Sequence, residues 1–297
     1  MGKLIVILGP TGVGKTELSL QLAEQYQSPI VSADSRQIYR DLPIGTAAPT
    51  PAELQRVKHY FIGCKSLTES YSAGQYARDC HQLLSQLFLL HDHVIMVGGS
   101  MMYIDAVCNG LDDIPSVPES VRDSVRQMYA EHGLTWLQTE VERLDPVYWA
   151  EVDQQNPQRL MHCVEICLAS GAPYSSFRQR GLHAQMTDQE RGFEVEYRMI
   201  ERPREELYHR INQRVYQMID AGLLEEARRA FLLLGVSLQS LPEGVVDTLP
   251  NSVNTVGYKE LLPYFRGEYS LERAIELIQQ NSRHYAKRQL TWWRRKL

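Results

Sequence analysis

Hydrophobic residues near the start of the chain form short continuous runs separated by longer amphipathic stretches. Three apolar runs, rich in Val, Ile and Leu, cover Lys3 to Leu8, Ile30 to Ala33 and His93 to Val97. Such runs are typical of strands that are buried on both faces of a sheet. Apolar residues recur at helical spacing from Glu17 to Tyr26. Strands that alternate with helix-length segments predict an α/β fold with a doubly wound parallel sheet.

The middle of the chain has a different pattern. From residue 114 to residue 182 apolar residues recur at helical spacing without strand-like alternation, with helix breaks at Gly133, Asp145-Pro146 and Asn156-Pro157. We therefore predict an all-helical insertion domain at 114–182, set into a catalytic core formed by 1–113 and 183–297.

The pattern after the insertion predicts one more strand and three long helices. Alternation from Phe193 to Met199 indicates a strand that rejoins the sheet. Helical spacing then covers Pro203 to Ala221, Leu223 to Leu234, and Leu271 to the end of the chain. Gly222, between the first two, is a typical helix stop.

Composition excludes several classes of protein. The formal net charge is −5, from 31 Lys+Arg and 36 Asp+Glu, so the chain is no polycation. No run approaches the roughly 18 apolar residues that span a bilayer. Five scattered cysteines without a CxxC pair argue against a disulfide framework or zinc site, and Cys163 and Cys167 are interpreted as buried apolar residues. We expect a cytoplasmic protein, and a monomer because no exposed apolar repeat is evident.

The strongest motif is a phosphate-binding loop. Residues 9–16 read Gly-Pro-Thr-Gly-Val-Gly-Lys-Thr, which fits G-x-x-x-x-G-K-[ST] between a strand and a helix. Its glycines let backbone N–H groups surround a diphosphate, Lys15 adds charge at the terminal phosphate, and the Thr16 hydroxyl is placed to ligate Mg²⁺. The predicted diphosphate-binding residues are Gly9, Thr11, Gly12, Val13, Gly14, Lys15 and Thr16, and the predicted cofactor is Mg²⁺.

P-loops serve kinases, ATPases, GTPases and other transferases. The chain has no Asn-Lys-x-Asp motif for a GTPase, and the strand ending at Val97 continues as Gly98-Gly99-Ser100 without a carboxylate. The acid at a strand end is Asp34. Because parallel strands end at one edge of a sheet, Lys15, Asp34 and Ser100 should share a crevice. There Asp34 is either a general base or metal ligand, or the cap of the next helix.

Eight blocks of this sequence resemble the tRNA dimethylallyltransferase (isopentenyltransferase) family. In order they are the P-loop, Asp34-Ser35-Arg36-Gln37, Ile44-Gly45-Thr46-Ala47, Tyr71-Ser72-Ala73, Val97-Gly98-Gly99, Arg210-Ile211-x-x-Arg214, Asn254-Thr255-Val256-Gly257-Tyr258 and Lys287-Arg288-Gln289-Leu290-Thr291-Trp292. The resemblance implies transfer of the dimethylallyl group from dimethylallyl diphosphate to N6 of the adenosine 3′-adjacent to the tRNA anticodon, with release of diphosphate.

The resemblance also implies roles for individual residues. Asp34 would be the base, Arg214 would help Lys15 and Thr16 to hold the diphosphate, and Ser100 would lie beside the reacting centre. By itself, Arg214 is typical of a solvated helix charge. The insertion would contact the anticodon stem-loop. The implied tRNA-binding residues are Asp34, Ser35, Arg36, Gln37, Arg122, Gln158, Arg159, Thr255, Gly257, Tyr258, Lys287, Arg288, Gln289 and Arg294.

The last residues of the chain give separate evidence for RNA. Asn281 to Leu297 contains six Lys/Arg and no acid. Arg283, Lys287 and Arg294 fall along one stripe of a helix, with Trp292-Trp293 beside them. This pattern favours phosphate contacts and base stacking. A solvated charged face with tryptophans buried in the core is the alternative.

The sequence departs from the family pattern at two sites. Ser100-Met101-Met102-Tyr103 stands where Thr-Gly-Leu-Tyr is usual, and Ala48 stands where lysine is common. Three other functions remain open: a P-loop prenyltransferase acting on free adenine nucleotides, a P-loop small-molecule kinase, and a non-catalytic RNA-binding P-loop module.

Overall fold

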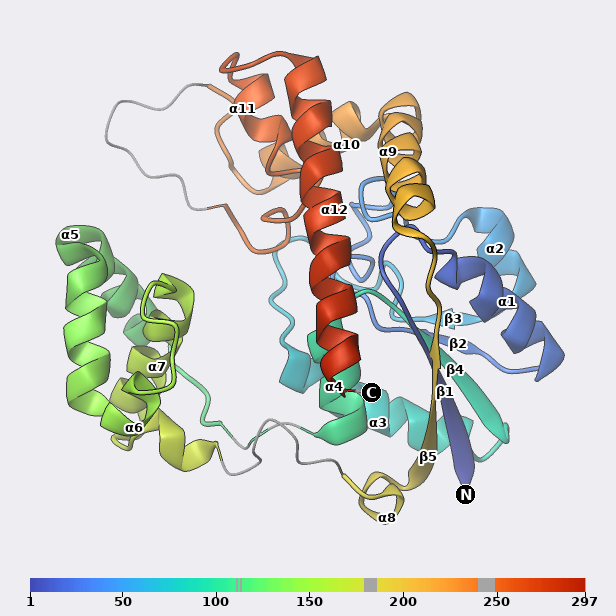
Figure 1. Ribbon diagram of the computed structural model, residues 1–297, viewed down its shortest axis with the longest axis horizontal. Helices are drawn as coiled ribbons and strands as arrows, with labels where there is room; N and C mark the ends of the chain where they lie inside the picture. Colours follow the sequence, from blue (N-terminus) through green and yellow to red (C-terminus); the bar gives the residue numbers. More distant parts are fainter. Residues whose placement is uncertain (111, 113, 179–185, 240–248, 297) are drawn as a thin grey trace. The chain divides into compact units, whose positions relative to one another are not determined.

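A computed structural model describes residues 1–110, 112, 114–178, 186–239 and 249–296 (Figure 1). The chain divides into two compact units. The first unit joins Met1–Cys108 to Met186–Leu297, and the second covers Asn109–Gln185. The predicted insertion at 114–182 lies inside the second unit.

The first unit contains a parallel sheet of five strands in the order β3-β2-β4-β1-β5. Their bounds are Gly2–Leu8 (β1), Ile30–Ser32 (β2), His59–Tyr60 (β3), His93–Val97 (β4) and Phe193–Met199 (β5). The predicted α/β class and the four predicted strands are confirmed to within a residue at their ends. The strand β3 was not predicted, because two residues carry no detectable alternation.

The central strand β1 explains why its run is apolar throughout. Leu4 to Leu8 are fully buried, since β4 pairs on one edge and β5 on the other. Leu4 and Val6 pack in one core cluster, whereas Ile5 and Ile7 pack in another. Successive strand side chains point to opposite faces, so one run supplies both cores.

Helices cover both faces of this sheet. On one face α1 (Lys15–Gln25) packs over Ile5 and Ile7, and on the other α3 (Ala73–Leu87) and α4 (Met101–Asn109) pack over Leu4 and Val6. The short helices are α2 (Pro51–Arg56), α8 (Asp188–Arg191) and α11 (Leu261–Phe265). The long ones that follow β5 are α9 (Arg204–Asp220), α10 (Leu223–Leu233) and α12 (Leu271–Lys296), and α12 runs beside α9 (Figure 1).

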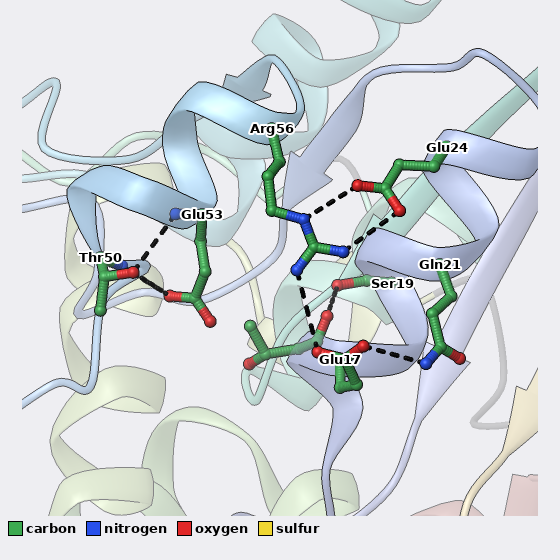
Figure 2. Close-up of polar contacts among 8 residues, drawn as sticks. Glu17, Ser19, Gln21, Glu24, Thr50, Glu53 and Arg56 are labelled. Carbon is green, nitrogen blue, oxygen red and sulfur yellow. Dashed lines mark hydrogen bonds and ion pairs between the residues drawn. The ribbon is translucent and has the colours of Figure 1, made fainter.

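The helices α1 and α2 are joined by polar contacts at their surface (Figure 2). The Arg56 guanidinium donates to both carboxylate oxygens of Glu24, at 2.9 and 3.1 Å, and lies 4.0 Å from Glu17. Thr50 and Glu53 form a capping box at the start of α2. Exposed ion pairs contribute little stability, because water and salt screen their charges. Their consequence is local, because they fix α2 against the helix that follows the P-loop.

The second unit is all-helical over its described residues, as predicted. It contains α5 (Glu119–Leu144), α6 (Pro146–Trp149), α7 (Pro157–Ser170) and a 3₁₀ turn at Tyr174–Phe177. Gly133, with φ +70°, interrupts α5 at the predicted break. No helix in the described part of the chain is long and apolar enough to cross a membrane.

Cys163 and Cys167 lie in the core of the second unit, as interpreted from the sequence, with their Sγ atoms 3.9 Å apart. The buried Asp145 carboxylate lies near both thiols. Its oxygens already accept hydrogen bonds from Tyr148 N at 3.0 Å, Ser175 N at 2.6 Å and Ser175 Oγ at 2.7 Å. We therefore assign Asp145 to the cap of α6 and the anchoring of the 3₁₀ turn.

Candidate functional site

The P-loop wraps the N-terminus of α1 in the predicted way. Gly9, Gly12 and Gly14 have φ angles of +149°, +83° and +108°, a region that L side chains rarely adopt. A Cβ on Gly9 would lie 2.7 Å from Ile200 O. Glycine is therefore required both by the backbone angles and by the close approach of the neighbouring chain. Thr11, Gly12, Gly14, Lys15 and Thr16 line a cavity of about 460 Å³, which we name the first cavity.

Lys15 turns back onto the loop that carries it. Its ammonium donates to Gly9 O at 2.8 Å and to Pro10 O at 3.0 Å. Burial, followed by the positive charge of Arg214, lowers the pKa of Lys15 to about 8, and the Asp34 carboxylate opposes this shift. A bound diphosphate would favour the charged amine.

Asp34 directly follows β2, and its two carboxylate oxygens have different surroundings. Oδ1 accepts from Arg36 N at 2.9 Å and Gln37 N at 3.4 Å, so it caps the following turn. Oδ2 points toward Gly99, where an added Cβ would lie only 3.0 Å from it. Capping and chemistry, the two alternatives for Asp34, are therefore compatible, since each uses a different oxygen.

Ser100 binds the end of β4 to the turn that holds Asp34. Its Oγ accepts from Ser35 N at 2.7 Å and donates to Ser35 Oγ at 2.9 Å, while its backbone N donates to Ala33 O at 3.1 Å. Of the two unusual methionines, Met101 packs against the sheet core and Met102 is half exposed. The Ser100 hydroxyl thus contacts Ser35 with these two methionines beside it.

Arg214 is not a solvated helix charge. It reaches from α9 to the P-loop, where its guanidinium donates to Thr11 Oγ1. Burial lowers the pKa of Arg214, and the nearby Asp34 carboxylate raises it. Arg214 therefore lies inside the site, as the family resemblance implied and its spacing on a helix did not.

A second cavity, of about 300 Å³, adjoins the first. The two share five lining residues, which are Thr11, Asp34, Thr46, Arg214 and Tyr285. The first cavity contains the P-loop, and the second contains Ser100, Thr255 and Gly257. Asp34 and Arg214 thus lie where the cavity that contains the P-loop meets the second cavity. This arrangement can hold two substrates that react across Asp34.

Most predicted RNA-binding residues of the first unit line one of the two cavities or are exposed on α12. Ser35, Arg36, Thr255, Gly257 and Arg288 line the second cavity, whereas Gln37 lines the first. Lys287, Arg288 and Arg294 are exposed on α12. Arg294 forms an ion pair with Glu201 at 2.9 Å.

Two residues predicted to bind tRNA are instead fully buried. The Tyr258 hydroxyl donates to Glu226 Oε1 at 2.6 Å. The Gln289 amide accepts from Thr11 N at 2.8 Å and donates to Gly99 O at 2.8 Å. Both side chains therefore have internal hydrogen-bond partners, and Gln289 also lines the first cavity. Their contact with RNA stays a prediction.

The structure distinguishes the two alternatives that the sequence left open for the end of α12. Trp293 is 4% exposed and packs in the core beneath the sheet, and Trp292 packs against the same cluster. The cationic residues lie on the outside, so the segment is a charged face over buried tryptophans. An amphipathic helix ending gives this pattern without any base stacking.

Sequence reasoning gave no role to three side chains that contact the loops of the site, two at the P-loop and one at the loop after β4. Arg202 Nε donates to Val13 O at 2.7 Å, and Arg210 Nε donates to Gly12 O at 2.9 Å. The Tyr285 hydroxyl donates to Gly99 O at 2.8 Å. Arg210 also lines the first cavity, one helical turn before Arg214. That spacing was the signal that could have found it.

The predicted RNA-binding residues of the second unit lie on its surface. Arg122 is 3.9 Å from Glu119 and 4.0 Å from Glu165. Gln158 and Arg159 are exposed at the start of α7, where Asn156 caps the Arg159 N–H. Their contact with RNA stays a prediction.

Comparison with known proteins covers nearly the whole chain. The family model described as IPP transferase matches residues 37–296. The tRNA dimethylallyltransferase 2 of Parabacteroides distasonis is 51% identical over 99% of this chain and 92% of its own length. The tRNA dimethylallyltransferase 1 of Bacteroides thetaiotaomicron is 50% identical over 99% and 89%.

Solved structures of similar fold are also tRNA prenyltransferases. The tRNA isopentenylpyrophosphate transferase of Bacillus halodurans has a TM-score of 0.64 at 32% identity, covering 99% of this chain and 87% of its own. A eukaryotic dimethylallyltransferase, captured acting on tRNA, shares the fold, with a TM-score of 0.77 at 23% identity over 98% and 70%. With the P-loop, Asp34 and Arg214 assembled around two joined cavities, this chain belongs to the IPP transferase family of tRNA dimethylallyltransferases.

Proposed function

We propose that this protein transfers the dimethylallyl group from dimethylallyl diphosphate to N6 of the adenosine 3′-adjacent to the anticodon of tRNA, releasing diphosphate. The observation that carries the proposal is the position of Asp34 and Arg214 on the wall between the two cavities. Membership of the family supplies the reaction class. Because the proposed substrate is tRNA, the enzyme would act in the cytoplasm.

The first cavity would hold the diphosphate. Its glycine-rich loop begins a helix, where backbone N–H groups favour anions. Lys15, Arg210 and Arg214 line the same cavity and add positive charge. As the bond between the allylic carbon and the diphosphate oxygen breaks, negative charge grows on the leaving group. Prearranged cations and N–H groups stabilise that charge more than the ground state, which accelerates the reaction.

Asp34 would act as the general base. The lone pair of the adenine amine is delocalised into the ring, so the amine is a weak nucleophile. As N6 bonds to the allylic carbon, its proton would pass to Asp34 Oδ2, while Oδ1 continues to cap the turn. A positioned base contributes about 10²–10⁴ in rate.

Mg²⁺ is the cofactor that fits the first cavity. Thr16, Glu17 and Glu53 line it with hydroxyl and carboxylate oxygens, which are the hard ligands that Mg²⁺ prefers. Thr16 would hold the ion through its hydroxyl, together with diphosphate oxygens. The ion would supply charge neutralisation of the leaving group.

The tRNA would be held mainly outside the cavities. Lys287, Arg288 and Arg294 form an exposed basic face on α12, suited to phosphate contacts. Arg122, Gln158 and Arg159 of the second unit would contact the anticodon stem-loop. The reacting base must leave its stack to enter a cavity, and a single-stranded loop makes this easier.

Mass spectrometry of nucleosides tests the function against its alternatives. Purified protein would be incubated with Mg²⁺ and dimethylallyl diphosphate, plus either unmodified tRNA or AMP, and with ATP alone. Prenylated adenosine in tRNA only is expected. Prenylated AMP would favour a prenyltransferase that acts on free adenine nucleotides. Consumption of ATP would favour a kinase. An Asp34→Ala variant that bound tRNA as before but lost turnover would exclude the non-catalytic RNA-binding module.

A further inference from the structure

Glu226 of α10 is a buried carboxylate outside the machinery described above. Its side chain is 1% exposed, and its oxygens accept three hydrogen bonds. Ile44 N donates to Oε2 at 2.8 Å, Gly45 N donates to Oε1 at 2.8 Å, and the Tyr258 hydroxyl donates to Oε1 at 2.6 Å. Burial of a carboxylate is unfavourable unless it is well hydrogen bonded. Because the three hydrogen bonds offset the cost of burial, Glu226 can hold the groups that donate them in fixed positions.

The first segment that Glu226 holds is the turn around Gly45. Gly45 and Thr46 line the second cavity, and Thr46 and Ala47 line the first. Gln37 Nε2 donates to Thr46 O at 3.2 Å and to Ala47 O at 3.0 Å. The same Gln37 donates its backbone N–H to Asp34 Oδ1 at 3.4 Å. The turn and Gln37 therefore connect the buried carboxylate to the proposed base through hydrogen bonds and short stretches of chain.

The second segment that Glu226 holds is the part of the second cavity's lining that precedes Tyr258. Tyr258, held by Glu226, directly follows Thr255, Val256 and Gly257, all of which line that cavity. This segment packs closely against the Gly45 turn, since a Cβ on Gly45 would lie 2.5 Å from the Tyr258 hydroxyl. One carboxylate thus fixes two segments that are far apart in the sequence.

We propose that Glu226 is a positioning residue for the acceptor adenosine. It sets the spacing of the Gly45 turn and the Thr255–Gly257 segment, and through Gln37 it holds the orientation of Asp34. The proposal rests on the proposed function and assigns to the adenosine the second cavity, which adjoins the diphosphate cavity at Asp34. A glutamine cannot replace the carboxylate, because its NH₂ group would oppose the N–H of Ile44 or Gly45.

The test compares Glu226→Gln with Tyr258→Phe in the complete protein. Tyr258→Phe keeps the carboxylate and both backbone hydrogen bonds and removes the hydroxyl alone, which makes it the matched control. For each variant, kcat and KM are measured with unmodified tRNA, and inorganic diphosphate affinity is measured by calorimetry. Thermal unfolding identifies a temperature at which every variant is folded.

We expect Glu226→Gln to lower kcat about 10–100-fold, since a misplacement near 1 Å can cost about 10² in rate. The KM for tRNA should change less than about threefold, because its affinity comes mainly from phosphate contacts elsewhere. Diphosphate affinity should also stay within about threefold, because the P-loop amides and cations that determine it lie outside this clamp. For Tyr258→Phe we expect a smaller fall in kcat, about 3–10-fold, by the same reasoning.

Two outcomes would overturn the proposal. One is a folded Glu226→Gln protein with wild-type kcat. The other is a loss of kcat matched by an equal loss of diphosphate affinity, which indicates general damage. If Glu226→Gln fails to fold, Tyr258→Phe decides, and an unchanged kcat there counts against the proposal. A wild-type protein that makes no prenylated adenosine would overturn the proposed function itself, which separates the two failures.

Discussion

Thr11 and Gln289, which are 278 positions apart, are joined by a 2.8 Å hydrogen bond from the backbone N–H of Thr11 to Oε1 of Gln289. The same amide donates to Gly99 O. One side chain of α12 therefore ties together the P-loop and the loop after β4, while Lys287 and Arg294 of that helix are exposed. The helix that presents charge to a polyanion also supports the diphosphate site.

Replacing Gln289 by Leu should destabilise this junction. The change removes the acceptor of the Thr11 N–H, at a cost of about 1–3 kcal/mol, whereas Gly99 O keeps its hydrogen bond from the Tyr285 hydroxyl. We expect a lower free energy of unfolding in urea, together with weaker diphosphate binding. Lys287→Ala, an exposed change on the same helix, should stay within about 0.5 kcal/mol of wild type. Equal stability of the two variants would refute the tethering role.

Asp34→Asn should remove the base and keep the turn. The amide oxygen can still accept from Arg36 N, but the side chain can no longer take a proton from N6. Single-turnover prenylation of tRNA should slow by about 10²–10⁴, with tRNA affinity retained. A rate within threefold of wild type would assign the proton to another acceptor.

Diphosphate binding should weaken as the pH rises through about 8. The pKa of Lys15 in the folded protein is about 8, lowered from 10.5, so the free enzyme loses this positive charge above pH 8. Calorimetric titration with inorganic diphosphate from pH 7 to 9.5 would show the change. Lys15→Gln has no such charge, so titrating it over the same range removes the contribution of the ligand's own ionisation. If the diphosphate affinities of the two proteins changed in parallel with pH, the change could not come from Lys15.

The same shift predicts how stability depends on pH. Between pH 8 and 10.5 the unfolded chain holds a proton on Lys15 that the folded protein does not hold. Because stability rises with pH wherever the unfolded state binds more protons, this lysine destabilises the fold below pH 8 and ceases to do so as the pH approaches 10.5. Urea unfolding of wild type and Lys15→Gln should therefore converge with rising pH. A constant difference would disprove this.

Binding of tRNA should depend strongly on salt, and binding of the allylic diphosphate much less. Removing one phosphate contact should reduce the slope of log affinity against log salt by about 1. We expect Lys287→Ala to approach this value and Arg294→Ala to fall short of it, since Arg294 already engages Glu201. Filter binding at several salt concentrations measures both slopes. Identical slopes for tRNA and the diphosphate would contradict a division of labour between α12 and the P-loop.

Local patterns determined much of this protein. The apolar runs, the glycine loop and the helical spacing from 114 to 182 predicted the strands, the P-loop and the helical unit, because each of these leaves a pattern in residues close in sequence. The end of a predicted strand located Asp34, and the family resemblance located Arg214. In each case the residue type and its neighbours in the chain carried the information.

Only the tertiary structure decided which polar side chains face the site and which hold it together. Gln289 and Trp293 lie in a basic, aromatic segment that resembles a surface, and Tyr258 follows a polar turn, yet all three are buried. Glu226 gave no signal, since one glutamate on an amphipathic helix looks like any other. Burial and hydrogen-bond partners depend on contacts between segments that are far apart in the sequence, and no local pattern predicts those contacts.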